Sequence, residues 1–548
     1  MPATVGDRTA TRHSAPSGSR TATLTLARFL LRQDRVKLPA WIVGLGLLVV
    51  YIGAALPELA PSEQDLAAAV PLLEQPVGRM FAGPAFGLDA PTYERFFAAG
   101  YLLYLFLLAA LMNIMLVVRH TRLEEQTGRA ELIRANVVGR DAPLTAALLV
   151  AVLADIAAAI VVTALAVGNG FALTGSLLVG AVTGATGLAF AGVTAVTVQL
   201  SESSRTAAGW AGVVVGVAFA LRGLGDMAEV GGSALSWTSP FGWASQTAPY
   251  VHDRWWPLLL LLGLGIVGAL LGFVLQNKRD LGAGLISARR GAATASRFLG
   301  TPLGLAWRLQ RGGLAGWAAS IVALGCVDGA FADVIVESAA DLPEAVRQMF
   351  GAEQLLTGYL AFLAIFGGYL TAAYVVFAAQ VLRAEETSGR AGALLATPVS
   401  RSAWAGSHLL VIGFGAAVIL LLTGVGTGAA VAGSLGDWQT FGDVVASHLN
   451  MIPAVLLVLG LCAALYGWVP GWLPAIGWAV VALAVFVGNF ADLLDLPEWV
   501  RALSPLSHPA DMPVESFDVL PALWLAVLAL AGAGIGLAGL RQRQIGVR

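Results

Sequence analysis

Apolar runs recur along the whole chain, and short stretches rich in charge separate them. Each run is long enough to cross a hydrocarbon core about 30 Å thick as an α-helix. In the first half we expect spans at roughly 39–56, 96–118, 142–168, 171–199, 207–224 and 257–276. In the second half we expect them at roughly 313–331, 355–381, 403–432, 445–467, 471–490 and 521–540. The pattern therefore predicts an all-α polytopic membrane protein of about 12 transmembrane helices, arranged as two tandem six-helix halves.

Composition excludes a soluble multidomain protein, because 57% of the 548 residues are hydrophobic and only 12% are charged. Both cysteines, Cys326 and Cys462, lie in apolar runs, so we expect no disulfide framework and no metal site. Of the 32 basic residues only Lys37 and Lys278 are lysines. This bias, with the abundance of Ala and Gly, is associated with high-GC bacterial genomes and indicates a bacterial protein.

One charged stretch occurs twice, at residues 119–140 and again at 383–401. A shift of 261 positions superimposes the two copies. The coinciding residues are Arg122 with Arg383, Glu124 with Glu385, Glu125 with Glu386, Gly128 with Gly389, Arg129 with Arg390, and Arg140 with Arg401. Such a repeat indicates a tandem duplication. We therefore expect a disordered cytosolic tail at 1–20, a first six-helix half at 21–276, a cytosolic linker at 277–301 and a second six-helix half at 302–548.

The distribution of basic residues predicts the orientation. With both termini in the cytosol, 26 basic residues lie inside. Six lie outside, namely Arg79, Arg95, Arg222, Arg254, Arg347 and Arg501. Short loops rich in Lys and Arg stay on the cytosolic side. We therefore expect a multi-pass protein of the bacterial plasma (inner) membrane, with both termini and both repeated loops in the cytosol.

A basic amphipathic stretch precedes the first span. Residues 24–37 place leucines on one helical face and Arg28, Arg32 and Arg35 on another. This arrangement is typical of a helix that lies along an anionic membrane surface. The alternative is an elongated cytosolic end of the first span.

Several kinds of chemistry are absent from the sequence. A P-loop requires a Gly-Lys pair, and the sequence contains none, so this chain does not bind ATP by a Walker motif. No HExxH, CxxC or GxSxG motif stands in a plausible context for hydrolytic or metal chemistry. We expect a chain that is not itself an enzyme and holds no cofactor.

Asp155 is the one carboxylate well inside a predicted span. A charged residue at that depth costs about 2.5–3.5 kcal/mol on insertion scales, so Asp155 should face a cavity or another helix. We expect a structural residue satisfied by a hydroxyl or backbone partner. The alternative, an ion-coupling residue, usually occurs with several others of its kind.

The repeated loop combines ion pairs and a turn. Glu125 and Arg129 stand at i,i+4, as do Glu386 and Arg390, which predicts two helical ion pairs. Ion pairs alone would make a plain surface helix. The glycine in both copies predicts instead a compact knob of two short helices, suited to docking into a cleft of a cytosolic partner.

The motif R-x-E-E-x-[TS]-G-R-A between the second and third spans, six spans per half and the preceding amphipathic helix resemble ABC-2-type exporter permeases. The duplicated form resembles the actinobacterial tetronasin or polyketide-antibiotic exporter permeases, which include mycobacterial multidrug efflux members. The resemblance covers essentially the whole chain. It implies a permease subunit that moves hydrophobic or amphipathic antibiotics, drugs or lipids out of the cell.

The resemblance also implies a partner, a separate cytosolic ATPase dimer that carries the ATP and Mg and whose closure opens a path between the halves. Residues 24–37 and 298–311 would be the membrane-surface connecting helices. The coupling residues would be Arg122, Glu124, Glu125, Arg129, Arg140, Arg383, Glu385, Glu386, Arg390 and Arg401. The second loop has Gly392 for Glu131 and Thr397 for Asn136, so the two ATPase contacts should differ.

The resemblance places the substrate path near the second and fifth spans of each half. Aromatic residues there are Phe97, Tyr101, Tyr104, Phe106, Tyr359, Phe362, Phe366 and Tyr369. Aromatics at this spacing are also what plain helix packing produces. Two other functions stay open: a secondary transporter driven by an ion gradient, and a membrane enzyme for lipid-linked substrates using Asp492 and Asp495.

Overall fold

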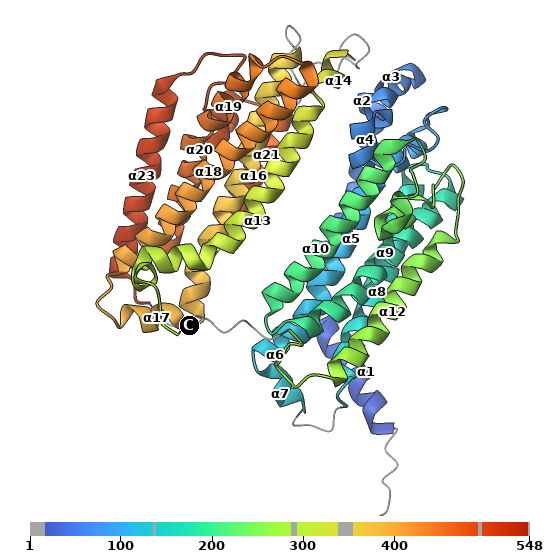
Figure 1. Ribbon diagram of the computed structural model, residues 1–548, viewed down its shortest axis with the longest axis horizontal. Helices are drawn as coiled ribbons and strands as arrows, with labels where there is room; N and C mark the ends of the chain where they lie inside the picture. The colour runs from blue at the N-terminus through green and yellow to red at the C-terminus, as the bar shows by residue number, and fades with distance from the viewer. Residues whose placement is uncertain (1–16, 135–138, 287–292, 338–354, 492–495, 546–548) are drawn as a thin grey trace, which may run out of the picture. The chain divides into compact units, whose positions relative to one another are not determined.

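The computed structural model describes residues 17–134, 139–286, 293–337, 355–491 and 496–545. These residues form helices and connecting loops without a β-strand (Figure 1). Eleven of the described helices are long and apolar enough to cross a membrane. A shorter apolar helix at Leu473–Asn489 corresponds to the eleventh predicted span. The predicted fold class, an all-helical polytopic membrane protein, is confirmed.

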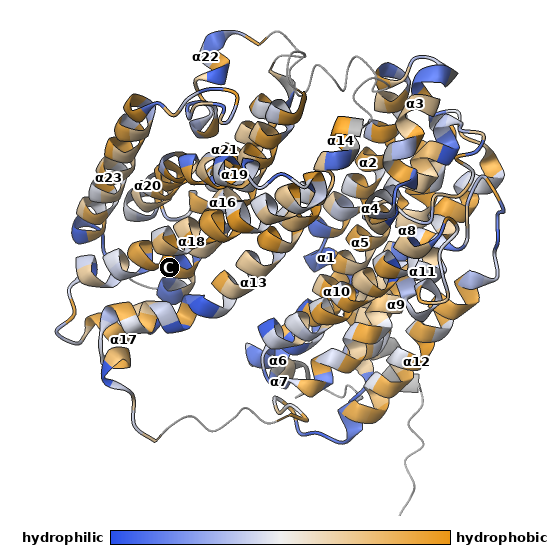
Figure 2. Cartoon of the chain, turned by 45° about the horizontal axis from the view of Figure 1, so that its top comes forward, coloured by the Kyte–Doolittle hydropathy of each residue, from blue (hydrophilic) through white to orange (hydrophobic). Residues whose placement is uncertain are grey.

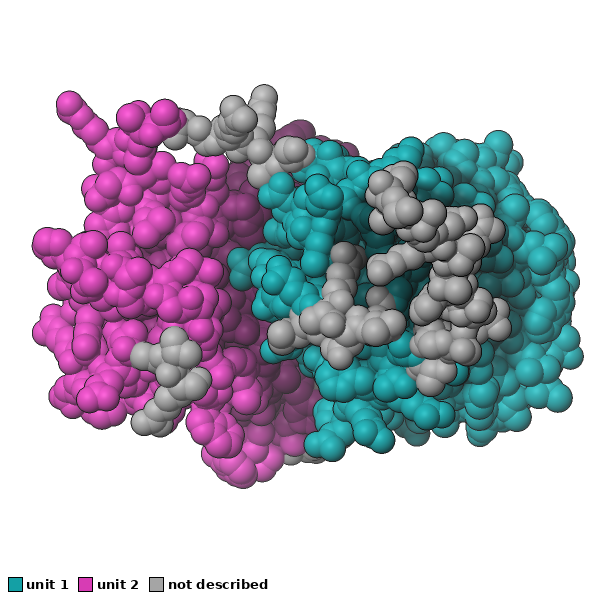
Figure 3. All heavy atoms as spheres, turned by 90° about the horizontal axis from the view of Figure 1, so that it is seen from below, with its two compact units in different colours: residues 1–290 teal, residues 291–548 magenta. Residues whose placement is uncertain are grey.

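The chain divides into two compact units, Met1–Arg290 (unit 1) and Gly291–Arg548 (unit 2), which Figure 3 colours separately. The long helices of unit 1 are α2 (Lys37–Leu59), α5 (Tyr93–Val118), α8 (Ala142–Gly168), α9 (Leu173–Leu200), α10 (Ser204–Ala228) and α12 (Pro257–Asn277). Those of unit 2 are α13 (Pro302–Ala330), α16 (Leu355–Thr387), α18 (Arg401–Leu435), α20 (Ile452–Trp468), α21 (Leu473–Phe490) and α23 (Val519–Gln542). Hydrophobic residues dominate these helices, whereas the loops are more hydrophilic (Figure 2).

Shorter helices connect and cap the long ones. In unit 1 they are α1 (Ser17–Gln33), α3 (Glu63–Glu74), α4 (Pro76–Phe81), η1 (Arg119–Leu123), α6 (Glu124–Gln126), α7 (Arg129–Arg134), η2 (Ser236–Thr238) and α11 (Pro240–Ser245). In unit 2 they are η3 (Arg297–Gly300), α14 (Ala332–Glu337), α17 (Arg390–Leu395), α19 (Thr440–Asn450), α22 (Glu498–Arg501) and η4 (Pro505–Ser507).

The two expected connecting helices differ in the structure. The helix expected at residues 24–37 is α1, which ends at Gln33, and Lys37 already begins α2. The stretch expected at 298–311 is no separate helix, because η3 ends at Gly300 and the remainder is the start of the continuous helix α13. Proline at Pro302 begins α13, and no break follows before Ala330.

In each unit the last long helix packs backbone to backbone against a neighbouring helix. A Cβ atom on Gly192 of α9 would lie 2.3 Å from the carbonyl oxygen of Gly265 in α12. In unit 2, a Cβ atom on Gly460 of α20 would lie 2.5 Å from the carbonyl oxygen of Ala529 in α23. Small residues let membrane helices approach this closely. Because the hydrophobic effect does not drive helices together in lipid, the resulting van der Waals contact stabilises the pair instead. The pairs α9–α12 and α20–α23 are therefore in direct backbone contact.

Candidate functional site

The repeated loop follows the same path in both units. In unit 1, α5 continues without a break through the π-helical turn η1 into α6, and the chain turns at Gly128 before α7. In unit 2, α16 ends at Thr387 and the chain turns at Gly389 before α17. The two glycines have φ of +76° and +77°, a conformation that costs other residues energy. In Figure 1 these short helices lie at one end of the long helices of their unit.

The first glutamate of each copy pairs across this turn. Nη1 of Arg129 lies 3.5 Å from Oε1 of Glu124, and Nη2 of Arg390 lies 2.7 Å from Oε1 of Glu385. The hydrogen bonds that Arg390 donates to Glu385 raise the pKa of Arg390. The predicted i,i+4 pairs of Arg129 with Glu125 and of Arg390 with Glu386 are wrong, because the glycine turn changes the register and the ion pairs span five residues.

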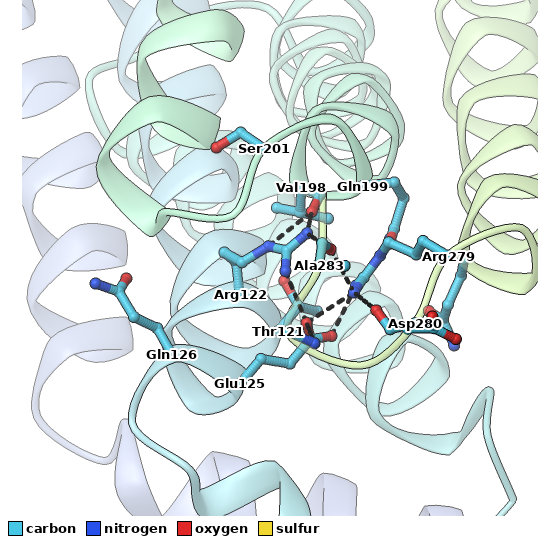
Figure 4. Close-up of polar contacts among 12 residues, drawn as sticks. Thr121, Arg122, Glu125, Gln126, Val198, Gln199, Ser201, Arg279, Asp280 and Ala283 are labelled. Atoms are coloured by element: carbon cyan, nitrogen blue, oxygen red, sulfur yellow. Dashed lines mark hydrogen bonds and ion pairs between the residues drawn. The ribbon is translucent and has the colours of Figure 1, made fainter. Parts of the chain in front are cut away.

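The second glutamate points inward instead. Oε1 and Oε2 of Glu125 accept hydrogen bonds of 2.7 and 2.8 Å from the two terminal nitrogens of Arg279, two residues after the end of α12. Nη1 of Arg122 donates to Oε2 of Glu125 at 2.8 Å. Figure 4 shows both guanidinium groups turned toward this carboxylate. Such a bidentate charged pair has a fixed geometry as well as a strong attraction.

Unit 2 repeats this arrangement with different support. Nη1 and Nη2 of Arg543, just after α23, donate to Oε1 and Oε2 of Glu386 at 2.7 and 2.8 Å. The hydroxyl of Tyr466 donates to Oε2 of Glu386 at 3.0 Å. Burial lowers the pKa of Arg543, but the hydrogen bonds and charge of Glu386 outweigh burial, so the pKa is raised above its ordinary value.

The last arginine of each loop caps the same helix. Nη2 of Arg140 donates to the carbonyl oxygens of Gln276 and Arg279 at 2.8 and 2.5 Å. Nη1 of Arg401 donates to the carbonyl oxygens of Leu540, Arg541 and Arg543 at 3.1, 3.1 and 2.6 Å. A cation is favoured at the carbonyl end of a helix, where unpaired acceptors and the negative end of the dipole meet.

The first arginines of the two copies are not equivalent. Arg122 is fully buried and donates from Nε and Nη2 to the carbonyl oxygen of Val198 at 3.0 and 2.7 Å. Arg383 is only partly buried and donates to the carbonyl oxygen of Gly471 at 3.1 Å. The structure thus brings the predicted loop residues together within each unit, but it gives Arg122 a structural environment that Arg383 lacks.

Sequence reasoning missed Arg279 and Arg543 as members of the site. A similarity between the two halves could have identified them. The last span of each half is followed by a related segment, Arg279-Asp280-Leu281-Gly282 or Arg543-Gln544-Ile545-Gly546. The spacing of 154 and 157 residues between each arginine and its glutamate carries no periodicity that predicts the contact.

Asp34 was also missed. It directly follows α1, is 3% exposed, and lies 2.7 Å through Oδ1 from Nη1 of Arg119, while Oδ2 contacts Nε2 of His120. The corresponding position of unit 2 by sequence is Gln310, whose Nε2 lies 2.9 Å from Nδ1 of His408. In each unit a residue near the start of the first span therefore contacts a buried histidine. That residue is a carboxylate in unit 1 and a neutral amide in unit 2.

Most of the aromatic residues expected along the substrate path pack inside their own unit. Phe97, Phe106, Tyr359 and Tyr369 are buried, and Phe97 contacts Phe171 at 5.4 Å between ring centroids. The remaining residues form the contacts Tyr101–Tyr104 at 6.4 Å and Phe362–Phe366 at 6.0 Å between centroids. Tyr104 is 46% exposed.

A groove of about 320 Å³ in unit 1 is lined by other residues, Lys37, Ala40, Trp41, Gly44, Leu45 and Leu108. The path itself stays a prediction.

Asp155 is buried against a partner that differs from the expected hydroxyl or backbone group. Its Oδ1 accepts a hydrogen bond of 2.8 Å from Nδ2 of Asn113 on α5. Asn113 also donates to the carbonyl oxygen of Ala109. Asp492 and Asp495, considered for an enzyme, lie outside the described residues. Among the residues that are described, no group of three His, Cys, Asp or Glu side chains could hold a metal ion.

Comparison with known proteins gives two matches. The family described as multidrug efflux system permease Rv1217c, C-terminal domain, matches residues 25–275 and 299–541. The multidrug efflux system permease protein Rv1217c of Mycobacterium tuberculosis is 36% identical over 554 aligned positions, which cover 100% of both chains.

Proposed function

The chain belongs to the family of multidrug efflux system permeases, and on that premise we propose that it is the transmembrane subunit of an ABC-2-type exporter. A separate cytosolic ATPase, bound as a dimer to the two repeated loops, drives it. The cargo is hydrophobic or amphipathic, such as antibiotics, drugs or lipids. The chain lies in the bacterial plasma membrane with both termini in the cytosol, as the excess of basic residues on that side predicts.

The observation that carries this proposal is the doubled, anchored loop. The inner side of each copy forms a bidentate ion pair with an arginine one or two residues after the last helix. Its other side is exposed through Thr127, Arg129 and Glu131 in unit 1. A surface that is rigid on its inner side and exposed on its outer side binds a partner with little loss of conformational entropy.

The second loop exposes a different set of side chains. Thr387, Ser388, Arg390 and Gly392 are exposed there, so the arginine is common to both copies and the acidic residue at Glu131 is not. The two ATPase contacts therefore share an exposed arginine, but only the first also has an exposed glutamate close to it. The absence of a Gly-Lys pair from the sequence supports ATP hydrolysis in the partner.

Co-expression with an ABC ATPase subunit from the same organism tests the proposal. We expect the ATPase to co-purify with the wild type and ATP to drive uptake of doxorubicin, an amphipathic antibiotic, into inside-out vesicles. The double variant Arg129→Glu/Arg390→Glu should release the ATPase, because it reverses the exposed charge of both loops and leaves the inner ion pairs intact.

Arg308→Glu is the matched control, since it reverses a basic residue of α13 outside both loops. It should retain the ATPase. If no ATPase associates with the wild type and uptake follows a proton gradient without ATP, the exporter proposal is wrong. A secondary transporter driven by an ion gradient then becomes the better reading.

A further inference from the structure

Two parts of each repeated loop are attached to the end of the last helix of its unit, and both attachments include the arginine that follows that helix. The second glutamate binds the arginine after that helix, Glu125 with Arg279 and Glu386 with Arg543. The final arginine of the loop, Arg140 or Arg401, donates to carbonyl oxygens at the end of the same helix. The arginine after the last helix therefore contacts the loop twice, through its side chain and through its backbone carbonyl oxygen.

The inner ion pair recurs in both units, while its surroundings differ. In unit 1 Arg122 and Gln199 complete it, with Nε of Arg279 donating to Oε1 of Gln199 at 2.6 Å. In unit 2 Tyr466 donates to the glutamate and stacks beneath Arg543, whose guanidinium carbon lies 5.3 Å from the ring centroid. Two different sets of neighbours hold the same bidentate geometry, so the geometry is not a by-product of one particular packing.

We infer that Arg279 and Arg543 are positioning residues of transport, which make each loop move together with the last helix of its unit. The inference rests on the proposed function, because it takes the loop as the ATPase contact. It assigns the two glutamates of the motif different tasks. The first, with its exposed arginine, belongs to the docking surface, and the second transmits the displacement inward.

The helix that receives this displacement does not move alone. Gly268 of α12 lies against the backbone of Gly192 in α9, and Gly532 of α23 lies against the backbone of Gly460 in α20. Backbones in direct contact leave no flexible side chains between them to absorb a shift. A displacement of the loop in unit 1 therefore moves α9 and α12 as one body, and in unit 2 it moves α20 and α23.

Fluorescence from single labelled cysteines tests the inference without knowledge of the cargo. Leu259 and Leu520 are each 70% exposed, near the starts of α12 and α23, far along each helix from the loop. Leu259→Cys or Leu520→Cys is introduced with Cys326→Ser and Cys462→Ala and labelled with an environment-sensitive fluorophore. ATP added to the complex with the ATPase should change the fluorescence at both positions.

The two arginines should act separately. Arg279→Gln should reduce the ATP response at position 259 about tenfold, within the usual range of coupling between sites, and leave the response at position 520 unchanged. Arg543→Gln should do the reverse. Both variants should still bind the ATPase, because the exposed residues of the loops are unchanged. Arg390→Gln, which breaks the outer pair, should weaken ATPase binding and leave the response of the bound complex intact.

A variant in which the two charges of the ion pair are exchanged distinguishes loss of the contact from misfolding. Unit 2 is suited to it, because Arg383 donates to Gly471 rather than to the glutamate. Arg543→Glu should abolish the response at position 520, and Glu386→Arg/Arg543→Glu should restore it. Equal responses in Arg279→Gln and the wild type, equal losses at both labels, or no restoration by the reversed pair would each overturn the inference. Failure of the wild type to bind any ATPase would instead overturn the proposed function, and the inference with it.

Discussion

Gly187 of α9 lies against the carboxylate of Asp155 so closely that a Cβ atom on Gly187 would be 2.2 Å from Oδ1. The same atom would be 2.5 Å from Nδ2 of Asn113. The hydrogen bond between Asn113 and Asp155 therefore occupies the space that a side chain on α9 would need. Because both polar residues are buried, neither can move aside into solvent.

Gly187→Ala should lower the stability of the protein by about 1–3 kcal/mol, since the added methyl group displaces a buried hydrogen bond. Thermal unfolding in detergent, followed by circular dichroism, measures the change. Gly212→Ala in α10 is the control, because a Cβ atom there meets nothing within 4 Å. An equal effect of the two substitutions would show that the contact around Asp155 is looser than described.

Asp155→Asn should leave ATP-driven doxorubicin uptake within about a factor of two of wild type. Asp155 has a side-chain partner, Asn113, and serves as a buried structural group under the exporter proposal. A carrier coupled to an ion gradient would instead lose uptake entirely. Uptake by inside-out vesicles separates the two, provided that the variant is present at the wild-type level. Loss of uptake with normal ATPase binding would favour the carrier.

Asp226→Ala should destabilise unit 1 by about 3–5 kcal/mol. Asp226 and Arg222 form a buried ion pair at 3.2 Å, and Oγ of Ser236 donates to the same carboxylate at 2.5 Å. Removal of the carboxylate leaves the Arg222 guanidinium buried without its counter-charge. The double variant Arg222→Met/Asp226→Ala should recover much of the loss, because it removes both charges together. Thermal unfolding of the two single variants and the double variant measures this coupling, and strictly additive effects would contradict it.

Arg543→Gln and Arg390→Gln should differ in stability although both residues pair with a loop glutamate. The side chain of Arg543 is 19% exposed, so its loss should cost about 1.5–3 kcal/mol. The side chain of Arg390 is 61% exposed, and an exposed pair contributes about 0–1 kcal/mol. Parallel thermal unfolding of the purified variants compares them. A larger loss for Arg390→Gln would reverse the assignment of inner and outer pairs.

Gly389→Ala should cost about 1–2 kcal/mol, because φ of +77° brings a Cβ atom close to the following carbonyl oxygen. Gly389→Asn should cost less, since asparagine tolerates this conformation better. No neighbouring atom lies within 4 Å of a Cβ atom at this position, so the effect isolates backbone conformation. Gly392→Ala, three residues on within α17, should be neutral or slightly stabilising. Thermal unfolding of the three variants tests the ranking.

The sequence by itself determined the class of the protein, its predicted spans and the repeat of the charged loop. Apolar runs identify membrane helices because a segment that crosses the hydrocarbon core needs about 20 mostly apolar residues. Such a segment is helical because a helix satisfies its own backbone hydrogen bonds in lipid. The repeat is equally visible, since Arg122, Glu125 and Arg140 recur at one constant shift. The turn at Gly128 also follows from a local rule about backbone conformation.

Only the tertiary structure decided which charges meet. Glu125 binds Arg279 rather than Arg129, and Asp155 binds an amide 42 residues away rather than a hydroxyl or a backbone group. Helical periodicity describes neighbours three and four residues apart, whereas these contacts depend on which helices pack together. That packing follows from small residues such as Gly192 and Gly265 that let two backbones touch, and a glycine in an apolar run does not reveal its partner.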